Sequence, residues 1–178
     1  VGKVGTETVT RDELRALGGE GHRKVLDRRA VPERVRSERS RGHKIVFANG
    51  CFDLLHVGHV RLLRFAKSKG DILVVGLNSD RSVRRLKGEG RPILGQRERA
   101  EILASLEDVD YVVLFDEETP ARIIREIEPD ILVKGEDYAD RPVVGREVVE
   151  KRGGRVELAP LVQGVSTTDL VQRMRRSR

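Results

Sequence analysis

The chain has 178 residues, of which 38% are hydrophobic, a length that suits one α/β domain with a small appendage. Its single cysteine, Cys51, excludes a disulfide framework within the chain, and no apolar stretch approaches the roughly 18 residues of a membrane span. The net charge of +6 lies at the ends, because residues 43–171 carry 20 Lys and Arg against 22 Asp and Glu. Because this part of the chain is not basic and only 3% of all residues are aromatic, the chain is not expected to bind nucleic acid, nor is a membrane expected as a partner. The single cysteine suits a reducing compartment, so we expect a cytoplasmic protein.

Residues 1–43 are polar, rich in Arg and Glu, and interrupted by glycines and a proline, so they cannot form a core of their own. We interpret them as a linker or N-terminal extension of a domain that covers residues 44–178. Two short helices are predicted in the extension, at residues 11–17 and 32–39, because Thr10 can cap the first and Pro32 suits the first turn of the second.

From residue 44 onward, short apolar runs alternate with helical patterns. The runs are typical of buried parallel strands and lie at residues 45–48, 72–77, 111–115 and 131–133, with a weaker fifth at 156–158. The helical patterns are Val60, Leu63 and Ala66, then Ala100, Leu103 and Leu106, then Ile123, Ile124 and Ile127. This alternation predicts an α/β fold with a doubly wound, mostly parallel, five-stranded sheet of Rossmann-like type, in which ligands bind outside the carboxyl ends of the strands.

The loop after the first run holds two histidines. It reads Asn49-Gly50-Cys51-Phe52-Asp53-Leu54-Leu55-His56-Val57-Gly58-His59, and an amphipathic helix follows. Side chains three apart share one helix face, and a helix N-terminus favours anionic phosphate. The imidazoles can donate hydrogen bonds to charge that develops at phosphorus. The alternative is that His56 and His59 are ordinary loop and cap residues; a zinc site is disfavoured because no third ligand lies nearby.

Residues 50–59, G-C-F-D-L-L-H-V-G-H, closely resemble the H-x-G-H motif of the cytidylyltransferase-like nucleotidyltransferases. A second signature of that superfamily is an S-T-T triplet that opens a late helix, and Ser166-Thr167-Thr168 stands in the matching place. Hydroxyls and backbone N–H groups at a helix N-terminus can hold the pyrophosphate end of a nucleotide. Taken alone, the triplet would be read as a helix cap.

Four further segments, at residues 78–80, 84–88, 91–92 and 133–138, resemble the enzymes that adenylylate D-glycero-β-D-manno-heptose 1-phosphate. The resemblance covers residues 43–176. It implies that ATP and the sugar phosphate give ADP-heptose, a precursor of the lipopolysaccharide inner core, and pyrophosphate. It further implies Mg²⁺ held by triphosphate oxygens and water rather than by protein ligands, and a homodimer.

The same resemblance implies a role for each site residue. The catalytic residues would be His56, His59 and Lys87. The nucleotide would contact Asn49, Gly50, Phe52, Gly58, Lys134, Gly135, Asp137, Ser166, Thr167 and Thr168. The sugar phosphate would contact Asp53, Asp80 and Arg99.

Simpler interpretations exist for several of these residues. Lys87 can be a solvated residue of a basic loop, Arg99 a surface residue of its helix, and Lys134 a plain charge at a strand end. Asp53 can serve as a loop cap. Cys51 has no partnered base, so we interpret it as a small buried hydrophobe without a catalytic role.

Residues 1–10 resemble the tail of a ribokinase-like domain, and residues 24–27 resemble the connector that follows it in fused enzymes. We therefore expect the second half of a bifunctional protein whose partner, fused or separate, is a heptose kinase. Two alternatives stay open. One is a cytidylyltransferase or other nucleotidyltransferase acting on a small phosphorylated alcohol, and the other is a nucleotide-binding module without catalysis.

Overall fold

A computed structural model of the chain describes residues 23–162, 164 and 167. The strands are β1 (Val25–Leu26), β2 (Ile45–Gly50), β3 (Ile72–Asn78), β4 (Tyr111–Phe115), β5 (Ile131–Gly135) and β6 (Arg155–Ala159). The α-helices are α3 (Val31–Ser40), α4 (Val57–Lys67), α5 (Asp80–Lys87), α6 (Gln96–Ala104), α7 (Ala121–Ile127) and α8 (Arg146–Glu150). Two 3₁₀ turns, η1 (Arg28–Ala30) and η2 (Glu136–Tyr138), complete this part of the chain.

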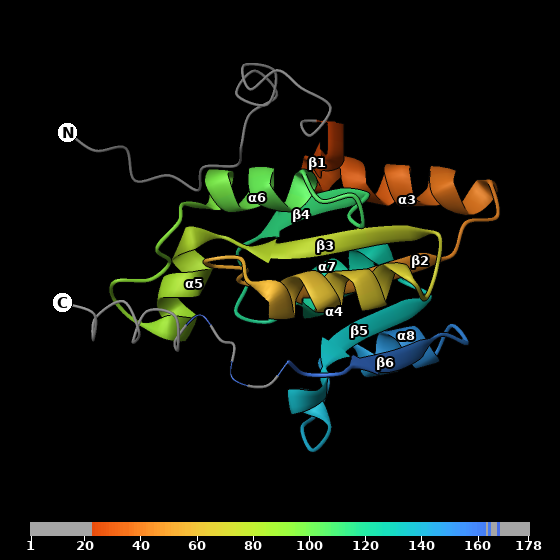
Figure 1. Cartoon of the computed structure of the whole chain (residues 1–178). Coiled ribbons are helices and arrows are strands. Elements are labelled where there is room, and N and C mark those ends of the chain that lie inside the picture. The colour runs from red at the N-terminus through yellow and green to blue at the C-terminus, as the bar shows by residue number, and fades with distance from the viewer. Residues whose placement is uncertain (1–22, 163, 165–166, 168–178) are drawn as a thin grey trace.

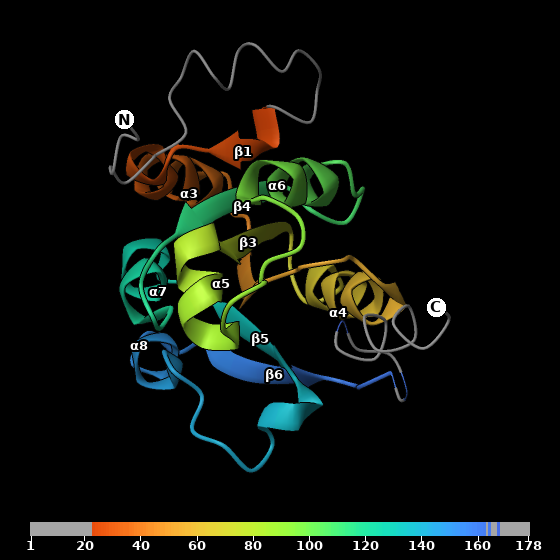
Figure 2. The same ribbon diagram turned by 90° about the vertical axis from the view of Figure 1, so that its left-hand side faces the viewer.

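All six strands join one sheet in the order β1-β4-β3-β2-β5-β6, and every neighbouring pair is parallel. The chain runs outward from β2 through β3 to β4, and then crosses to β5 and β6 on the other side of β2. The strand order therefore reverses between β2 and β5. In doubly wound sheets ligands bind at such a reversal, outside the carboxyl ends of the strands. Figure 2 looks toward those ends, with α5 in front of the sheet.

Helices cover both faces of the sheet, which explains the continuous apolar runs in the sequence. Along β3, Leu73, Val75 and Leu77 pack on the face that α4 and α6 cover, whereas Val74 packs on the opposite face with α3, α7 and α8. Figure 2 shows α4 and α6 on one side of the sheet and α3, α7 and α8 on the other, and in Figure 1 α4 lies in front of the sheet and α7 behind it. None of the helices described is long and apolar enough to cross a membrane.

The N-terminal segment packs onto this sheet from residue 24 onward. Val31 and Val35 of α3 are 0% and 1% exposed. Glu38, which is 4% exposed, accepts hydrogen bonds from the Tyr111 hydroxyl at 2.7 Å and from His43 Nδ1 at 2.9 Å. Burial opposes ionisation of Glu38, but these hydrogen bonds hold its pKa below the ordinary value. The division into an extension (1–43) and a domain (44–178) stays a prediction, while α3 and β1 contribute to the core.

The five predicted strands are confirmed, but the sheet has a sixth strand, because β1 pairs with β4. Only two residues, Val25 and Leu26, form β1, which is too short for a pattern to show in a polar segment. The predicted helix at 32–39 corresponds to α3, and the one at 11–17 lies outside the described residues. The interpretation of Lys87 as part of a loop is wrong, because α5 extends to Lys87.

We predict that Tyr111→Phe lowers the free energy of unfolding by about 1.5–3 kcal/mol, because it removes a hydrogen bond to a buried carboxylate. Urea denaturation followed by circular dichroism measures the change. Tyr138→Phe is the matched control, since no hydrogen bond of the Tyr138 hydroxyl is present among the described residues. Equal urea midpoints for the two variants would show that the contact between Tyr111 and Glu38 does not contribute to the stability of the fold.

Candidate active site

The loop at residues 51–56, which we call the motif loop, connects β2 to α4 and has a strained backbone. Phe52 and Leu54 both adopt left-handed conformations, with φ angles of 45° and 46°. Each such residue costs about 1–3 kcal/mol unless its surroundings hold it in place. The contacts of Asp53, which lies between these two residues, show how the motif loop is held in this conformation.

Asp53 lies between the two strained residues, and its carboxylate is 2% exposed. It accepts hydrogen bonds from Arg91 Nε at 2.7 Å and from the backbone N–H groups of Ile93 and Leu94 at 2.9 and 3.1 Å. The backbone carbonyl of Asp53 accepts a further hydrogen bond from the Thr167 hydroxyl at 2.7 Å. Asp53 therefore fastens the motif loop to residues 91–94, and Thr167 brings the second motif against the first. The role of Asp53 toward a sugar phosphate stays a prediction.

His56 caps the N-terminus of α4 with its own ring. Its Nδ1 accepts a hydrogen bond from the backbone N–H of Gly58 at 3.2 Å. A ring nitrogen that accepts carries no proton, so the neutral ring keeps its proton on Nε2. Burial lowers the pKa of His56, and the ring is therefore neutral at pH 7. His56 thus offers Nε2–H as a hydrogen-bond donor without carrying a charge.

His59 lies one turn further along α4 and stacks on His56, with 3.8 Å between the ring centroids and 23° between the planes. The Phe52 ring meets it edge-on, 5.2 Å away. Burial, together with the neighbouring His56, lowers the pKa of His59 to about 4. Its Nδ1 is buried and has no hydrogen-bond partner within the described residues. Two stacked imidazoles at a helix N-terminus therefore form a neutral pair of donors, beside which the helix dipole favours an anion.

The side chain of Arg99 is a buried hub between the loops at this edge of the sheet. Arg99, on α6, is 1% exposed, so the interpretation as a surface residue is wrong. Its Nε donates to the Leu94 carbonyl at 3.0 Å, and Nη1 donates to the carbonyls of Cys51 and Asn78 at 2.5 and 2.9 Å. Its Nη2 donates to the Asp80 carboxylate at 2.7 Å. These contacts occupy four of the five guanidinium N–H groups. Contact of Arg99 or Asp80 with the sugar phosphate stays a prediction.

Lys134, on β5, and Asn49, on β2, meet where the strand order reverses. Lys134 Nζ donates to Asn49 Oδ1 at 2.5 Å, and the lysine is 6% exposed. Burial lowers the pKa of Lys134 to about 8, although the nearby charge of Asp137 raises it. A Cβ on Gly135 would overlap an oxygen of Asp137, so only glycine lets that carboxylate fold back over the strand end.

The remaining predicted residues surround the motif loop. Lys87 is the last residue of α5 and is exposed. Burial raises the pKa of Cys51, although the charges of Lys87 and Arg99 act in the opposite direction. The thiol therefore stays protonated at pH 7, and the absence of a catalytic role for Cys51 stays a prediction. A Cβ on Gly50 would lie 3.3 Å from the Phe52 ring. The predicted residues Ser166 and Thr168 lie outside the described residues.

Residues 47–173 match the family model described as cytidylyltransferase-like. The match covers well over half of the chain and includes His56, His59 and Thr167. The chain belongs to the cytidylyltransferase-like family. This membership connects the two motifs that the structure brings together at one edge of the sheet.

Curated relatives of this family member include proteins named bifunctional protein HldE. The one from Geotalea uraniireducens is 54% identical and the one from Citrifermentans bemidjiense is 56% identical, each over 98% of this chain. The match covers only 36% and 37% of the two relatives. The chain thus spans a little over a third of the length of the relatives that it resembles.

Two solved structures resemble the fold. A lipopolysaccharide core biosynthesis protein from Thermoplasma volcanium is 31% identical, with a TM-score of 0.55, over 68% of this chain and 98% of its own. A pantoate-beta-alanine ligase from Francisella tularensis, complexed with beta-gamma ATP and beta-alanine, has a TM-score of 0.54 at 18% identity, over 85% of this chain and 76% of its own. The second likeness shows the fold alone.

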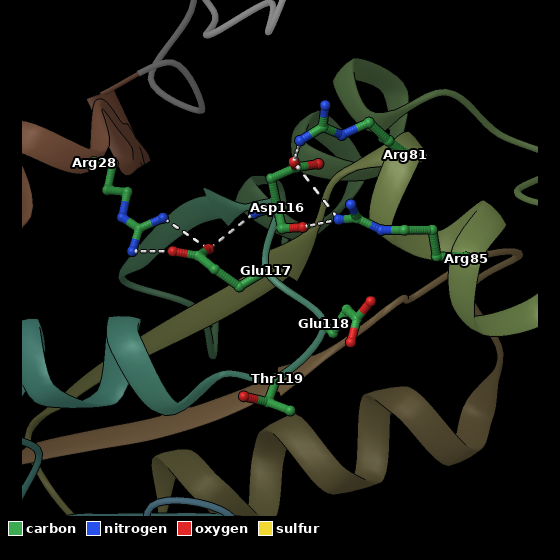
Figure 3. A pocket seen from close by; sticks show the side chains of 7 residues that line it. All are labelled: Arg28, Arg81, Arg85, Asp116, Glu117, Glu118 and Thr119. Carbon is green, nitrogen blue, oxygen red and sulfur yellow. Dashed lines mark hydrogen bonds and ion pairs between the residues drawn. The ribbon is translucent and has the colours of Figure 1, made fainter.

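Sequence reasoning missed a charged cavity of about 540 Å³ at the carboxyl end of β4 (Figure 3). It is lined by Arg28, Arg81, Arg85, Asp116, Glu117, Glu118 and Thr119. Arg28 pairs with Glu117 at 2.8 Å, and Asp116 pairs with Arg81 and Arg85 of α5. Ion pairs at this cavity therefore join both the N-terminal segment and α5, the helix that ends in Lys87, to the end of β4. No motif marks it, because its charges come from separate parts of the chain.

Sequence reasoning also missed the anchoring role of Arg91 and the contact of Asn78 with Arg99. The only signal in the sequence was the charge pattern. Arg91 and Arg99 follow a glycine-rich turn and flank residues 92–98, which include the backbone groups that bind Asp53. A lone arginine after a turn is usually solvated, so that signal has little weight.

We predict that Arg99→Met lowers the free energy of unfolding by about 3–5 kcal/mol, because the partners of the buried guanidinium lose their donors. Chemical denaturation measures the difference. Arg125→Met, at an exposed position of α7, is the matched control and should change stability by less than about 0.5 kcal/mol. An Arg99→Met variant as stable as the control would contradict this role.

A second prediction concerns stability at acid pH. An unfolded histidine takes up its proton near pH 6.5, whereas folded His59 does so only near pH 4. Stability should therefore fall as the pH drops from about 6.5 to 4, with His59 contributing up to roughly 3 kcal/mol of the loss. In His59→Gln this part of the loss should disappear, as measured by denaturation at a series of pH values. An unchanged pH dependence in the variant would refute it.

Proposed function

We propose that this chain transfers AMP from ATP to the phosphate of D-glycero-β-D-manno-heptose 1-phosphate, giving ADP-heptose and pyrophosphate. The observation that carries the proposal is the neutral pair of His56 and His59 at the N-terminus of α4, with Thr167 bonded to the same loop. Helix N-termini, backbone N–H groups and neutral imidazoles together suit a polyphosphate.

The comparisons support the choice of substrate. Relatives named HldE are more than 50% identical over nearly the whole chain. The lipopolysaccharide core biosynthesis protein matches over almost its full length at 31% identity. Both agree with the resemblance of the loops to heptose 1-phosphate adenylyltransferases. A cytidylyltransferase acting on another phosphorylated alcohol would share the two motifs, and therefore only assays separate the two.

The reaction needs positioning and charge stabilisation more than proton transfer. An oxygen of the sugar phosphate attacks the α-phosphorus of ATP, and the bond from that phosphorus to the bridging oxygen breaks as pyrophosphate leaves. The attacking phosphate is already ionised at pH 7, so no general base is required. The Nε2–H of His56 and the ring of His59 would donate to oxygens on which charge develops, and the exposed ammonium of Lys87 would add positive charge.

The remaining site residues would bind and orient the substrates. Asn49, Lys134 and Asp137, with the flanking Gly50, Phe52, Gly58 and Gly135, would hold the nucleotide, and Ser166, Thr167 and Thr168 its pyrophosphate end. Asp53, Asp80 and Arg99 would shape the place of the sugar phosphate, chiefly through the ion pairs that fix the loops. Both carboxylates are engaged by arginine.

Magnesium fits this site only as part of the nucleotide. Because Asp53 and Asp80 are paired with arginines, neither is free to serve in a carboxylate cage. Among the described residues, no three His, Cys, Asp or Glu side chains gather into a metal site. The ion would be held by triphosphate oxygens and water, as is usual for Mg²⁺, and would neutralise the leaving pyrophosphate.

We further propose that the chain works beside a heptose kinase in the cytoplasm. The relatives are named bifunctional and are nearly three times as long as the matched part, which leaves room for a second activity. The packing of α3 and β1 onto the sheet would fix where a preceding domain joins. Homodimer formation is part of the same proposal and can be measured by sedimentation.

We predict that His59→Ala lowers turnover by about 10²–10³ while the fold is kept, because one donor to the transition state is lost. Pyrophosphate release is measured with ATP or CTP against heptose 1-phosphate, glycerol phosphate and ethanolamine phosphate. His43→Ala, which changes a histidine outside the candidate active site, should keep the turnover. Full activity in His59→Ala would remove His59 from the mechanism, and release only with CTP would replace the proposed substrate pair.

A further inference from the structure

The helix α5 has little apolar surface in contact with the sheet. Among its 8 residues only Ser82 and Val83 are buried. The Ser82 hydroxyl accepts a hydrogen bond from Asn78 Nδ2 at 2.9 Å and donates one to the Glu117 carbonyl at 3.1 Å. Hydrophobic contact is not directional, so one buried valine does not fix the rotation of a helix about its axis. The orientation of α5 therefore depends on its polar contacts.

Asp116, which directly follows β4, holds one face of α5. Arg81 and Arg85 are four residues apart and so share that face, and both point toward Asp116 (Figure 3). The Asp116 carboxylate binds Arg81 and lies 3.6 Å from Nη2 of Arg85, which also donates to the Asp116 carbonyl. The carboxylate further accepts a hydrogen bond from the hydroxyl of Ser79, the N-cap of α5. Asp116 thus binds the helix both at its cap and along one face.

A second face of α5 is turned toward the candidate active site. Asp80 and Lys87 lie about two helical turns apart and share a face, which is not the face of the two arginines. The Asp80 carboxylate accepts from Arg99 Nη2 at 2.7 Å, which shows the direction of this face. Lys87 is followed four residues later by Arg91, which pairs with the motif loop at 2.7 Å. In agreement with this position, the charge of Lys87 acts on the thiol of Cys51.

Asp116 is ionised in the folded chain. Burial opposes its ionisation, but the Ser79 hydroxyl and the two guanidinium groups hold its pKa below the ordinary value. Its side chain is 33% exposed, and an ion pair so open to water adds little to the stability of a fold. Asp116 is therefore suited to fixing the orientation of a helix rather than to holding the domain together.

We propose that Asp116 is a positioning residue, which through Arg81 and Arg85 fixes the rotation of α5 about its axis and so keeps the Lys87 ammonium directed at the polyphosphate. The inference rests on the proposed function for the part that Lys87 plays in the reaction. Rotation of a helix moves all of its side chains together, and a misplacement of about 1 Å can cost about 10²-fold in rate. Asp116 can thus influence the reaction through α5 without touching either substrate.

The first test is a double-mutant cycle on turnover. Asp116→Asn keeps the size of the side chain and an acceptor for Ser79, but it removes the charge that binds the two arginines. The kcat for pyrophosphate release from ATP and heptose 1-phosphate should fall at least about tenfold, as it should in Lys87→Met. In the double variant kcat should stay within about twofold of Lys87→Met, because no ammonium is left to position. Losses that multiply would overturn the inference.

A second readout needs no turnover. Cys51 is the only cysteine of the chain; burial raises the pKa of its thiol, and the charge of Lys87 lowers it. The rate of alkylation by iodoacetamide is measured over a series of pH values, because only the thiolate reacts. The midpoint of the profile gives the pKa, and its plateau gives the access to the thiol. The midpoint should move to higher pH in Lys87→Met and in Asp116→Asn alike, and a midpoint that Asp116→Asn leaves unchanged would contradict the proposal.

Glu150→Gln is the matched control, since it removes an exposed carboxylate that pairs with Arg146 at 3.0 Å on α8. It should keep both the kcat and the Cys51 profile of the wild type. Asp116→Glu restores the charge and should recover most of the turnover that Asp116→Asn loses.

Circular dichroism verifies that each variant is folded. If Asp116→Asn does not fold, Arg85→Gln removes a partner from the same ion pairs at an exposed position and is measured in its place. An absence of pyrophosphate release from the wild type with every acceptor would refute the proposed function. The Cys51 profile would still decide whether Asp116 positions Lys87.

Discussion

Four segments of the chain meet on the guanidinium of Arg99. It binds the carbonyls of Cys51, Asn78 and Leu94 and the carboxylate of Asp80, which belong to the motif loop, the end of β3, the loop before α6 and the start of α5. A rigid fork of five donors can hold several acceptors at fixed angles, which a flexible lysine cannot do. The positions of the imidazoles and of the helix that carries Lys87 therefore depend on one buried side chain, supported by the carboxylate of Asp53.

Charge is distributed unevenly over the residues of the candidate active site. The stacked histidines are neutral because they are buried against each other and against Phe52, whereas Lys87 is exposed. On β5, the only hydrogen-bond partner of Lys134 within the described part of the chain is the Asn49 amide. The cations thus stand at the edges and uncharged donors at the centre. In the proposed reaction, such an arrangement would attract a polyanion and leave the reacting phosphorus among groups that need not change protonation, so little reorganisation would be required.

The strands were predictable because both faces of the sheet are covered, which demands apolar residues at every position. The helix α5 was not, because its buried face consists largely of Ser82 and Val83, and Ser82 is held by polar contacts with Asn78 and Glu117. The sequence identified the motif histidines from their spacing. It could not place Asn49 beside Lys134, since 85 residues separate them and only the strand order brings them together. Local pattern thus predicts elements, while contacts between distant loop residues need the fold.

The hydrogen bond from Thr167 to the Asp53 carbonyl joins residues 114 positions apart. Asp53 follows β2 and Thr167 follows β6, so the contact between the two motifs can form only after all six described strands have been synthesised. A nascent chain that still lacks Thr167 can therefore bury most of its core before the two motifs are joined.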